Sequence, residues 1–255
     1  MDLSFIQIVL IIIVTMIAAV DQFNFLESFY RPIVIGPIIG AIMGDLETGL
    51  IIGASYELMM IGAMPVGGAQ PPNAVIGGVM ATVFGISLNL DAAAALPLAI
   101  PFALLGQYAV TLLFTAMAPL MTRADKFADE ANPKGITAIN ILAMCALALL
   151  FSGIVLVGLL SGQTIGTTLT EVLPKWVWTG LSAAGAMMPA LGFAMLMKVM
   201  LSKKYLHFLF LGFVLVAYLQ LPLLAVAIVG LVLAIYDFQH NKKIDDQKAV
   251  GTDGI

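Results

Sequence analysis

Charged residues are scarce in this chain of 255 residues: Asp, Glu, Lys and Arg make up 10% of it, whereas hydrophobic residues make up 61%. An ordinary soluble domain is about 25% charged. The few charges also cluster, so that none occurs in 3–20, 92–122, 135–170, 176–197 or 205–236. Each of these stretches meets or nearly meets the roughly 18 to 20 residues that a helix needs to cross the hydrocarbon of a bilayer. The scarcity of charge therefore predicts a membrane protein with several crossings.

Several functional signatures are missing as well. The single cysteine, Cys145, lies in an apolar run, which leaves neither a disulfide framework nor a thiolate metal site. His207 and His240 have no second candidate ligand nearby in the sequence, so we expect no metal, no cofactor and no catalytic residue. No Gly-x-x-x-x-Gly-Lys motif is present, which argues against nucleotide hydrolysis. A net charge of −4 without a basic patch argues against a nucleic-acid partner.

Apolar stretches cover most of the chain: 3–20, 33–64, 74–90, 94–120, 136–161, 177–200 and 205–236. The first is interpreted as an uncleaved transmembrane helix, because it lacks the positively charged leader of a secretory signal. Two others, 33–64 and 205–236, exceed one crossing. We expect the former to divide at Gly44, with Asp45 capping the second helix. We expect the latter to turn or kink at Gln220-Leu221-Pro222.

Other stretches carry prolines or charges. Residues 94–120 are expected to be broken or kinked at prolines, and Gly185–Gly192 is expected to interrupt a further helix. The mixed-charge segment 122–134 is expected to be an aqueous loop, and 237–255 a polar, disordered tail. Residues 1–236 are thus predicted to form an all-α polytopic membrane domain, a multi-helix bundle with broken and re-entrant helices.

The most informative stretch lies between Glu57 and Asp91, where no residue is charged and the middle reads Gly67-Gly68-Ala69-Gln70-Pro71-Pro72-Asn73. The bilayer core cannot hydrogen-bond a bare backbone, so irregular backbone at membrane depth survives only inside protein or beside a water-filled cavity. Transporters bind polar substrates at broken helices of this kind. The stretch therefore predicts a transporter of a small polar solute.

Three residues near this stretch are candidates for contact with that solute. Glu57 is a carboxylate within an otherwise apolar helix, which marks a functional candidate. It could accept hydrogen bonds from paired sugar hydroxyls, or it could be a structural carboxylate that bonds a broken-helix amide. Gln70 and Asn73 offer donors and acceptors together, as recognition of vicinal hydroxyls or an acetamido group requires. Asn73 could equally cap a helix that begins near Ala74, and both roles can coexist.

A second polar cluster, Asp21-Gln22-Phe23-Asn24-Phe25, ends the first apolar span. Carbohydrate sites often combine amides and carboxylates with an aromatic ring against the sugar. The same cluster is equally compatible with an interfacial helix end and its aromatic belt. The predicted substrate-binding residues are Asp21, Gln22, Asn24, Glu57, Gln70 and Asn73.

Five motifs in this order resemble the IIC subunit of the mannose-type phosphotransferase system, a class of bacterial sugar permeases. They are Asp21-Gln22-Phe23-Asn24, Arg31-Pro32-Ile33-Val34, Gly44-Asp45-Leu46-Glu47-Thr48-Gly49, Gly53-Ala54-Ser55-Tyr56-Glu57 and Gly67-Gly68-Ala69-Gln70-Pro71-Pro72-Asn73. The resemblance implies a multi-pass protein of the bacterial cytoplasmic (inner) membrane, surrounded by lipid. It further implies pairing with a IID membrane subunit, in a higher oligomer of IIC–IID pairs. Soluble IIA and IIB subunits would relay a phosphoryl group from phosphoenolpyruvate, and the IIB phosphohistidine would donate it to the incoming sugar.

The Asp-Gln-Phe-Asn and Gly-Ala-Gln-Pro-Pro-Asn forms look closest to members that handle N-acetylgalactosamine or galactosamine. The function predicted by the resemblance is therefore inward movement of a hexose or amino sugar, with N-acetylgalactosamine as the first choice. The alternative is a proton-coupled secondary transporter in which Glu57 or Asp21 carries the proton. A membrane scaffold that transports nothing is disfavoured, because a scaffold needs no broken helices.

Overall fold

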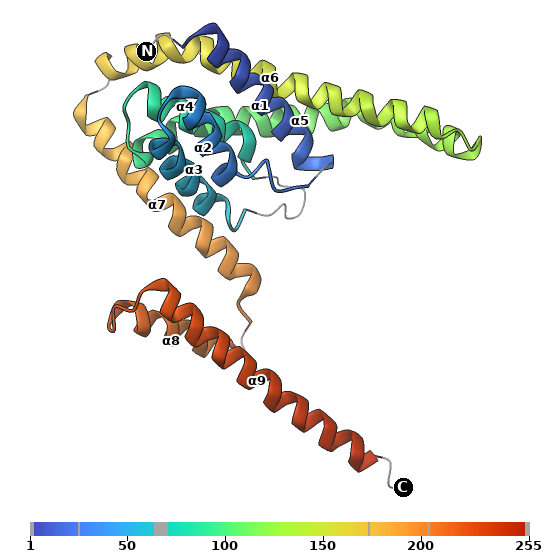
Figure 1. The fold of residues 1–255 in the computed structure, drawn as a ribbon, viewed down its shortest axis with the longest axis vertical. Coiled ribbons are helices and arrows are strands. Elements are labelled where there is room, and N and C mark those ends of the chain that lie inside the picture. Colours follow the sequence, from blue (N-terminus) through green and yellow to red (C-terminus); the bar gives the residue numbers. More distant parts are fainter. Residues whose placement is uncertain (1–2, 25, 64–70, 173, 203–204, 253–255) are drawn as a thin grey trace. The chain divides into compact units, whose positions relative to one another are not determined.

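The computed structural model describes residues 3–24, 26–63, 71–172, 174–202 and 205–252, and every regular element in these ranges is a helix (Figure 1). The helices are α1 (Phe5–Asn24), α2 (Pro32–Met43), α3 (Leu46–Met60), α4 (Ala74–Ser87), α5 (Ala92–Asp129), α6 (Pro133–Val172), α7 (Lys175–Met200), α8 (Leu206–Ala217) and α9 (Leu223–Thr252). The chain forms two compact units, Met1–Lys198 and Val199–Ile255. The predicted all-α class is confirmed.

The helices fall into two length classes. Five stretches are long and apolar enough to cross a membrane: α1, α5, Pro133–Ser161 of α6, α7, and Leu223–His240 of α9. The apolar helices α2, α4 and α8 have 12, 14 and 12 residues. At 1.5 Å per residue such helices extend only about 18 to 21 Å, short of the roughly 30 Å of hydrocarbon. Short and full-length helices thus occur together, as the sequence predicts.

Helix α4 forms the centre of the first unit. Its residues from Ala74 to Ile86 are all buried, and α1, α2, α3, α5 and α6 pack around it. A helix that is apolar on every side suits either a protein core or lipid, and α4 is enclosed by the protein. Because Asn73 immediately precedes α4, this central helix fixes the place of the segment that carries Asn73.

Helices α2 and α3 meet through glycines, Gly36 and Gly40 on α2 and Gly49 and Gly53 on α3. A Cβ atom built on Gly36 would lie 2.5 Å from the carbonyl oxygen of Gly49 and 2.7 Å from the Cα of Gly53. One built on Gly49 would lie 2.6 Å from the carbonyl oxygen of Gly36 and 2.7 Å from the Cα of Gly40. Backbone therefore touches backbone, the close approach that small residues permit between helices in lipid.

The predicted division at Gly44 is confirmed. Helix α2 ends at Met43, and Gly44 takes the left-handed conformation with φ 87°, which suits a residue without a Cβ. The Oδ1 of Asp45 accepts a hydrogen bond from the Thr48 N–H at 3.0 Å and so caps α3. Glu47 lies in the first turn of α3, near the positive end of the helix dipole.

The predicted break in 94–120 and the predicted interruption at Gly185–Gly192 are wrong, whereas a kink in 94–120 stays a prediction. Helix α5 runs unbroken through Pro97, Pro101 and Pro119, and α7 runs unbroken through Pro189. Helical backbone is nearly obligatory in lipid, and neighbouring groups can cover the carbonyls that proline leaves unpaired. Around Pro97, for example, Gly185 of α7 packs closely against the carbonyl oxygen of Ala93.

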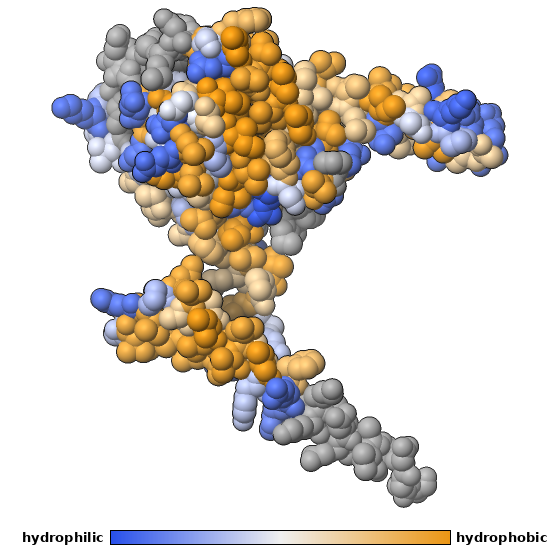
Figure 2. All heavy atoms as spheres, in the orientation of Figure 1, coloured by the Kyte–Doolittle hydropathy of each residue, from blue (hydrophilic) through white to orange (hydrophobic). Residues whose placement is uncertain are grey.

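The segment 122–134 is also not a loop, because only residues 130–132 separate α5 from α6. The two helices lie side by side and extend away from the rest of the first unit as a hairpin (Figure 1). Arginine, alanine and lysine favour helix, so the charged residues continue α5 instead of ending it. Figure 2 shows hydrophilic side chains at the far end of this hairpin, and apolar side chains over much of the remaining visible surface.

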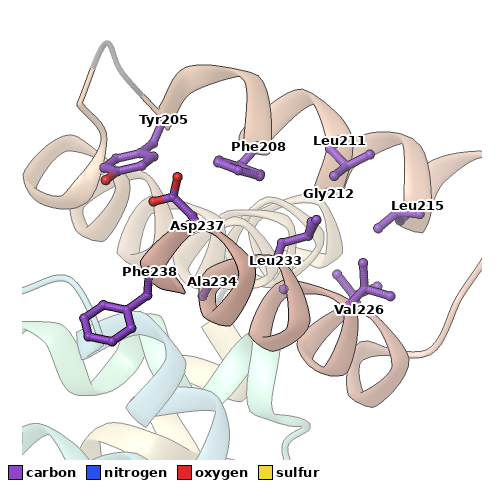
Figure 3. Close-up of a pocket in the computed structure, with 12 residues that line it drawn as sticks. Tyr205, Phe208, Leu211, Gly212, Leu215, Val226, Leu233, Ala234, Asp237 and Phe238 are labelled. Carbon is purple, nitrogen blue, oxygen red and sulfur yellow. The ribbon is translucent and has the colours of Figure 1, made fainter. Parts of the chain in front are cut away.

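The second unit contains α8 and α9. Helix α8 ends at Ala217, Gln220 has φ 51°, and Pro222 directly precedes α9, so the predicted turn is confirmed. A cavity of about 530 Å³ lies between the helices, with Phe208 and Leu211 of α8 on one side and α9 on the other (Figure 3). Helix α9 extends to Thr252, so residues 237–252 are helical, whereas the sequence predicts disorder for 237–255. The lysine, glutamine and alanine of this tail favour helix.

Candidate functional site

A cavity of about 510 Å³ lies where the end of α1, the start of α2, the end of α3 and the start of α4 come together. It is lined by Gln22, Phe23, Tyr30, Arg31, Pro32, Glu57, Met60, Ile61, Ala63, Pro71, Pro72, Asn73, Ala74, Val110 and Leu196. Ligand-binding cavities commonly measure about 300 to 1,000 Å³ and combine apolar walls with a few polar groups. This cavity has both features.

Three of the six predicted site residues, Gln22, Glu57 and Asn73, line this cavity together. Asp21 and Asn24 do not line it, although they are close to Gln22 in the sequence. Gln70 lies outside the described residues, together with the glycines that precede it. The fold thus unites the two polar clusters that the sequence shows separately.

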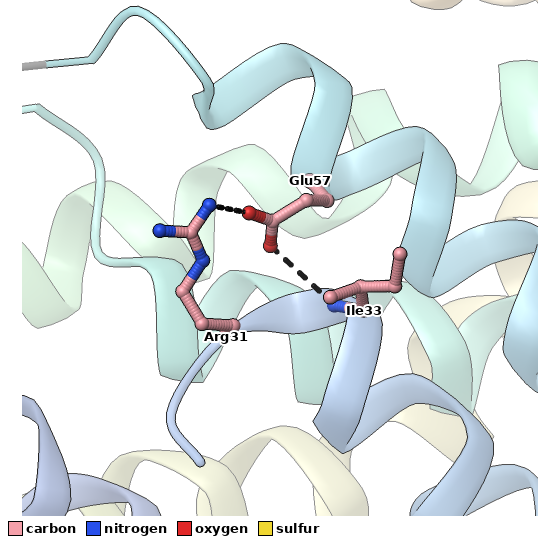
Figure 4. A network of polar contacts seen from close by, with 3 residues as sticks. All are labelled: Arg31, Ile33 and Glu57. Carbon is pink, nitrogen blue, oxygen red and sulfur yellow. Dashed lines mark hydrogen bonds and ion pairs between the residues drawn. The ribbon is translucent and has the colours of Figure 1, made fainter. Parts of the chain in front are cut away.

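Glu57 is held by two contacts (Figure 4). One carboxylate oxygen, Oε1, forms an ion pair with the guanidinium of Arg31, and Oε2 accepts a hydrogen bond from the Ile33 N–H at 3.5 Å. The Glu57 side chain is only 12% exposed, whereas that of Arg31 is 45% exposed. A buried carboxylate needs such partners, because an unpaired charge away from water is costly. A second terminal nitrogen of Arg31 points away from Glu57.

Arg31 is a site residue that reasoning from single residues missed. Its position in the Arg-Pro-Ile-Val motif contributed to the family resemblance, but no role was assigned to it. The available signal was charge: a carboxylate at membrane depth requires a cation, and Arg31 is the only cationic residue among the first 122. Proline at the first position of α2 then places Arg31 at the start of that helix, facing the end of α3.

Asn73 connects three helices. Its Oδ1 accepts a hydrogen bond from the Ile76 N–H at 2.9 Å, which caps α4 and confirms the predicted capping role. Its Nδ2 donates to Oε1 of Gln22 on α1 at 3.2 Å, and its backbone N–H donates to the carbonyl of Ala103 on α5 at 3.0 Å. Asn73 is 5% exposed. The capping amide therefore also forms part of the cavity wall.

Asp21 shapes the connection from α1 to α2. Its carboxylate is buried and accepts three hydrogen bonds, from the N–H groups of Leu26, Ser28 and Tyr30 at 2.9, 3.1 and 2.9 Å. Three backbone amides aimed at one carboxylate fix the course of the chain that leads to Arg31. Asn24, in contrast, is exposed at the end of α1.

A helical membrane protein with a cavity that carries a few polar groups, at the ends of several helices, has an architecture that suits a transporter. The family can also be assigned, because the model of the family described as the PTS system sorbose-specific IIC component, where PTS denotes the phosphotransferase system, matches residues 5–236. The chain belongs to this family of mannose-type IIC subunits. It is a transport subunit and a multi-pass protein of the bacterial inner membrane. The predicted family is confirmed.

Three relatives illustrate the range of the family. The chain is 38% identical over 214 residues to N-acetylgalactosamine permease IIC component 1 of Escherichia coli (strain K12), covering 84% of this chain and 80% of the relative. It is 34% identical over 258 residues to the sorbose-specific EIIC component of Lacticaseibacillus casei, covering 100% and 92%. It is 30% identical over 247 residues to the mannose-specific EIIC component of Escherichia coli (strain K12), covering 95% and 92%.

Two solved structures share the fold. One, described only as a membrane protein, superposes with a TM-score of 0.84 at 30% identity, covering 93% of this chain and 97% of that one. The other is a cryo-EM structure of the mannose transporter ManYZ in complex with microcin E492, with a TM-score of 0.59 at 31% identity, covering 94% and 97%.

Proposed function

We propose that this IIC subunit binds a hexose or amino sugar, with N-acetylgalactosamine as the best candidate, in the cavity lined by Gln22, Glu57 and Asn73. The sugar moves inward as a phosphorylated IIB partner transfers its phosphoryl group to it. The observation that carries the proposal is the convergence of a carboxylate, a guanidinium and two amides in one cavity of a IIC family member. The name of the relative with 38% identity supports the choice of sugar.

The chemistry of the cavity suits a sugar. The Glu57 carboxylate supplies acceptors and the Arg31 guanidinium supplies donors. Neighbouring sugar hydroxyls can bind both, because each hydroxyl can donate one hydrogen bond and accept others. Phe23 and Tyr30 add apolar surface for the faces of a pyranose ring. Gln70 and Asn24 stay as proposed contacts, and Asp21 is proposed to act by shaping the chain that carries Arg31.

A membrane partner and two soluble partners complete the proposal. IID would pair with this chain in a higher oligomer, and IIA and IIB would supply the phosphoryl group. The solved complex of the mannose transporter ManYZ, with its similar fold, supports a membrane assembly. The ion pair counts against Glu57 as a proton carrier, because protonating this carboxylate would leave the Arg31 guanidinium without its partner.

The test is uptake into membrane vesicles that contain the chain and IID but have no ion gradient. Labelled N-acetylgalactosamine is offered with phosphorylated IIB, with unphosphorylated IIB, or with neither. We expect phosphorylated sugar to accumulate only with phosphorylated IIB. Uptake driven by a proton gradient in the absence of IIB would overturn the proposal in favour of a secondary transporter.

A further inference from the structure

The side-chain amide of Asn73 can be oriented in only one way. Its Oδ1 meets the backbone N–H of Ile76 at 2.9 Å, and a backbone N–H can only donate, so the atom that faces it must be the oxygen. The Nδ2 group is therefore directed toward Gln22, at 3.2 Å. Because Nδ2 can only donate, the Gln22 atom that receives it must be Oε1.

This chain of contacts fixes what Gln22 offers to the cavity. Gln22 lines the cavity, and its Oε1 is held by Asn73. The group left for a ligand is Nε2 with its two N–H donors, which have no partner among the described residues. Asn73, the N-terminal cap of α4, thus determines that Gln22 on α1, 51 positions earlier in the sequence, presents donors to the cavity.

We propose that Gln22 is a specificity-determining residue that donates a hydrogen bond to an acceptor on the sugar, and that the cavity therefore prefers an N-acetylated amino sugar to the free amine. This inference rests on the proposed function. The carbonyl oxygen of an acetamido group can accept from Nε2. The ammonium group of galactosamine can only donate, so the two donors would face each other without an acceptor.

The two charged groups of the cavity add no preference for the ammonium group. Each oxygen of Glu57 can accept a further hydrogen bond, but its negative charge is already balanced by the ion pair with Arg31. The nearby Arg31 guanidinium carries a positive charge of its own and disfavours a second cation. A site that hydrogen-bonds one substrate group discriminates strongly against an analogue that lacks it, because the buried partner is left unpaired.

The test compares two sugars in the same sample. Membranes that contain the full chain with its IID subunit are titrated with labelled N-acetylgalactosamine and, at a mildly acidic pH that protonates the amine, with galactosamine. Mannose serves as a third ligand. The wild-type chain should bind the acetylated sugar at least about tenfold more tightly than the amine. A ratio of two affinities does not depend on the fraction of protein that is folded.

Three variants change whether residue 22 presents a hydrogen-bond donor or an acceptor to the cavity. Asn73→Ser keeps a capping oxygen but removes the Nδ2 donor, so the Gln22 amide is free to turn over without any new charge. Asn73→Asp keeps the cap and places an oxygen against Gln22, which draws Nε2 away from the cavity. Gln22→Glu replaces the donor directly. Each variant should lower the preference for the acetylated sugar about tenfold or more.

Asn132 provides a matched control, because its Oδ1 accepts from the Gly135 N–H at 3.2 Å at the start of α6, far from the cavity in the sequence and outside its lining. Asn132→Asp should leave the preference unchanged. A wild-type preference that persists in all three variants would overturn the inference while the proposed function stands. Wild-type binding of mannose in preference to either amino sugar would overturn this inference and the choice of N-acetylgalactosamine, while transport of a hexose would stand.

Discussion

The Arg31–Glu57 ion pair has two possible contributions, to the stability of the first unit and to sugar binding, and mutation can separate them. Glu57→Gln keeps the size of the side chain but removes its charge. If Glu57 accepts sugar hydroxyls, the loss of a charge-assisted hydrogen bond should weaken sugar binding by about 1.5 to 3 kcal/mol. Equilibrium binding to the assembled transporter measures this loss.

The double variant Arg31→Gln/Glu57→Gln tests whether the effect belongs to the sugar or to the fold. Each single variant leaves a polar partner unpaired, which costs stability, and the neutral pair should recover part of that loss. Sugar affinity should stay low in the double variant, because no carboxylate is present. Recovery of affinity together with stability would reduce Glu57 to a structural role.

Asp21 should be sensitive to loss of charge because three N–H groups converge on its carboxylate. In Asp21→Asn one oxygen becomes an NH₂ group, which cannot accept and faces an N–H donor. We expect a destabilisation of about 1.5 to 3 kcal/mol, measured by thermal unfolding in detergent. Asp91→Asn is the matched control: Asp91 accepts from the Ala94 N–H as the cap of α5, and Asn caps a helix equally well. Equal loss of stability in both variants would contradict the special role of Asp21.

At this scale the sequence predicts local contacts and misses distant ones. The capping roles of Asp45 and Asn73 could be predicted, because a cap binds an N–H three residues away. The partner of Glu57 lies 26 residues away and the partner of Asn73 on α1 lies 51 residues away, so neither follows from spacing. A search for the cation that a buried carboxylate requires would have found Arg31.

Among the elements, the pair of α2 and α3 is the most sensitive to added volume. Gly36→Ala or Gly49→Ala would place a methyl group 2.5 to 2.6 Å from the backbone of the facing helix. Because backbone cannot move aside as a side chain can, the helices must separate, at a cost of about 1 to 3 kcal/mol or more. Arg31 precedes α2 and Glu57 lies near the end of α3, so sugar affinity should fall as well.

Gly153 on α6 is the matched control for this prediction, because a Cβ built there meets nothing within 4 Å. Gly153→Ala should be neutral or should stabilise the helix by up to about 1 kcal/mol, since alanine is the better helix former. Thermal unfolding and sugar binding of Gly36→Ala, Gly49→Ala and Gly153→Ala measure these effects. Comparable behaviour of Gly36→Ala and Gly153→Ala would show that α2 and α3 do not depend on their close approach.

The existence of the helices could be predicted from the sequence better than their interruptions. The break at Gly44 is predicted by a glycine followed by a capping aspartate, and the turn at Gln220 by the nearby Pro222. The prolines of α5 and α7 do not end their helices. In lipid a broken helix would leave several backbone groups unpaired, which costs more than the one hydrogen bond that a proline removes. The Pro-Pro-Asn sequence, in contrast, does precede a helix start, because Asn73 supplies a cap.

On the scale of the whole molecule, the exposed surface is more apolar than an isolated protein in water could tolerate. Large hydrophobic side chains such as Phe5, Leu112 and Leu223 are 80%, 71% and 82% exposed, and the described part of α8 has no buried residue. An apolar environment such as lipid must cover such surfaces. Family and membrane class followed from the sequence, whereas the cavity required the fold, since it joins residues from 22 to 196.

The chain alone should be an incomplete transporter. The sequence contains no Gly-x-x-x-x-Gly-Lys motif, which argues against nucleotide hydrolysis by this chain as its energy source. Expressed alone in cells without other phosphotransferase subunits for this sugar, it should neither accumulate nor phosphorylate N-acetylgalactosamine. Co-expression with IID and the soluble IIA and IIB subunits should restore both activities together, whereas omission of IIB should abolish phosphorylation while binding persists.

Glu57→Gln in the complete system should lower uptake through weaker binding, with the IIA-to-IIB transfer unchanged. Robust gradient-driven uptake by the purified chain would contradict this dependence, because a secondary transporter needs no partner to drive it.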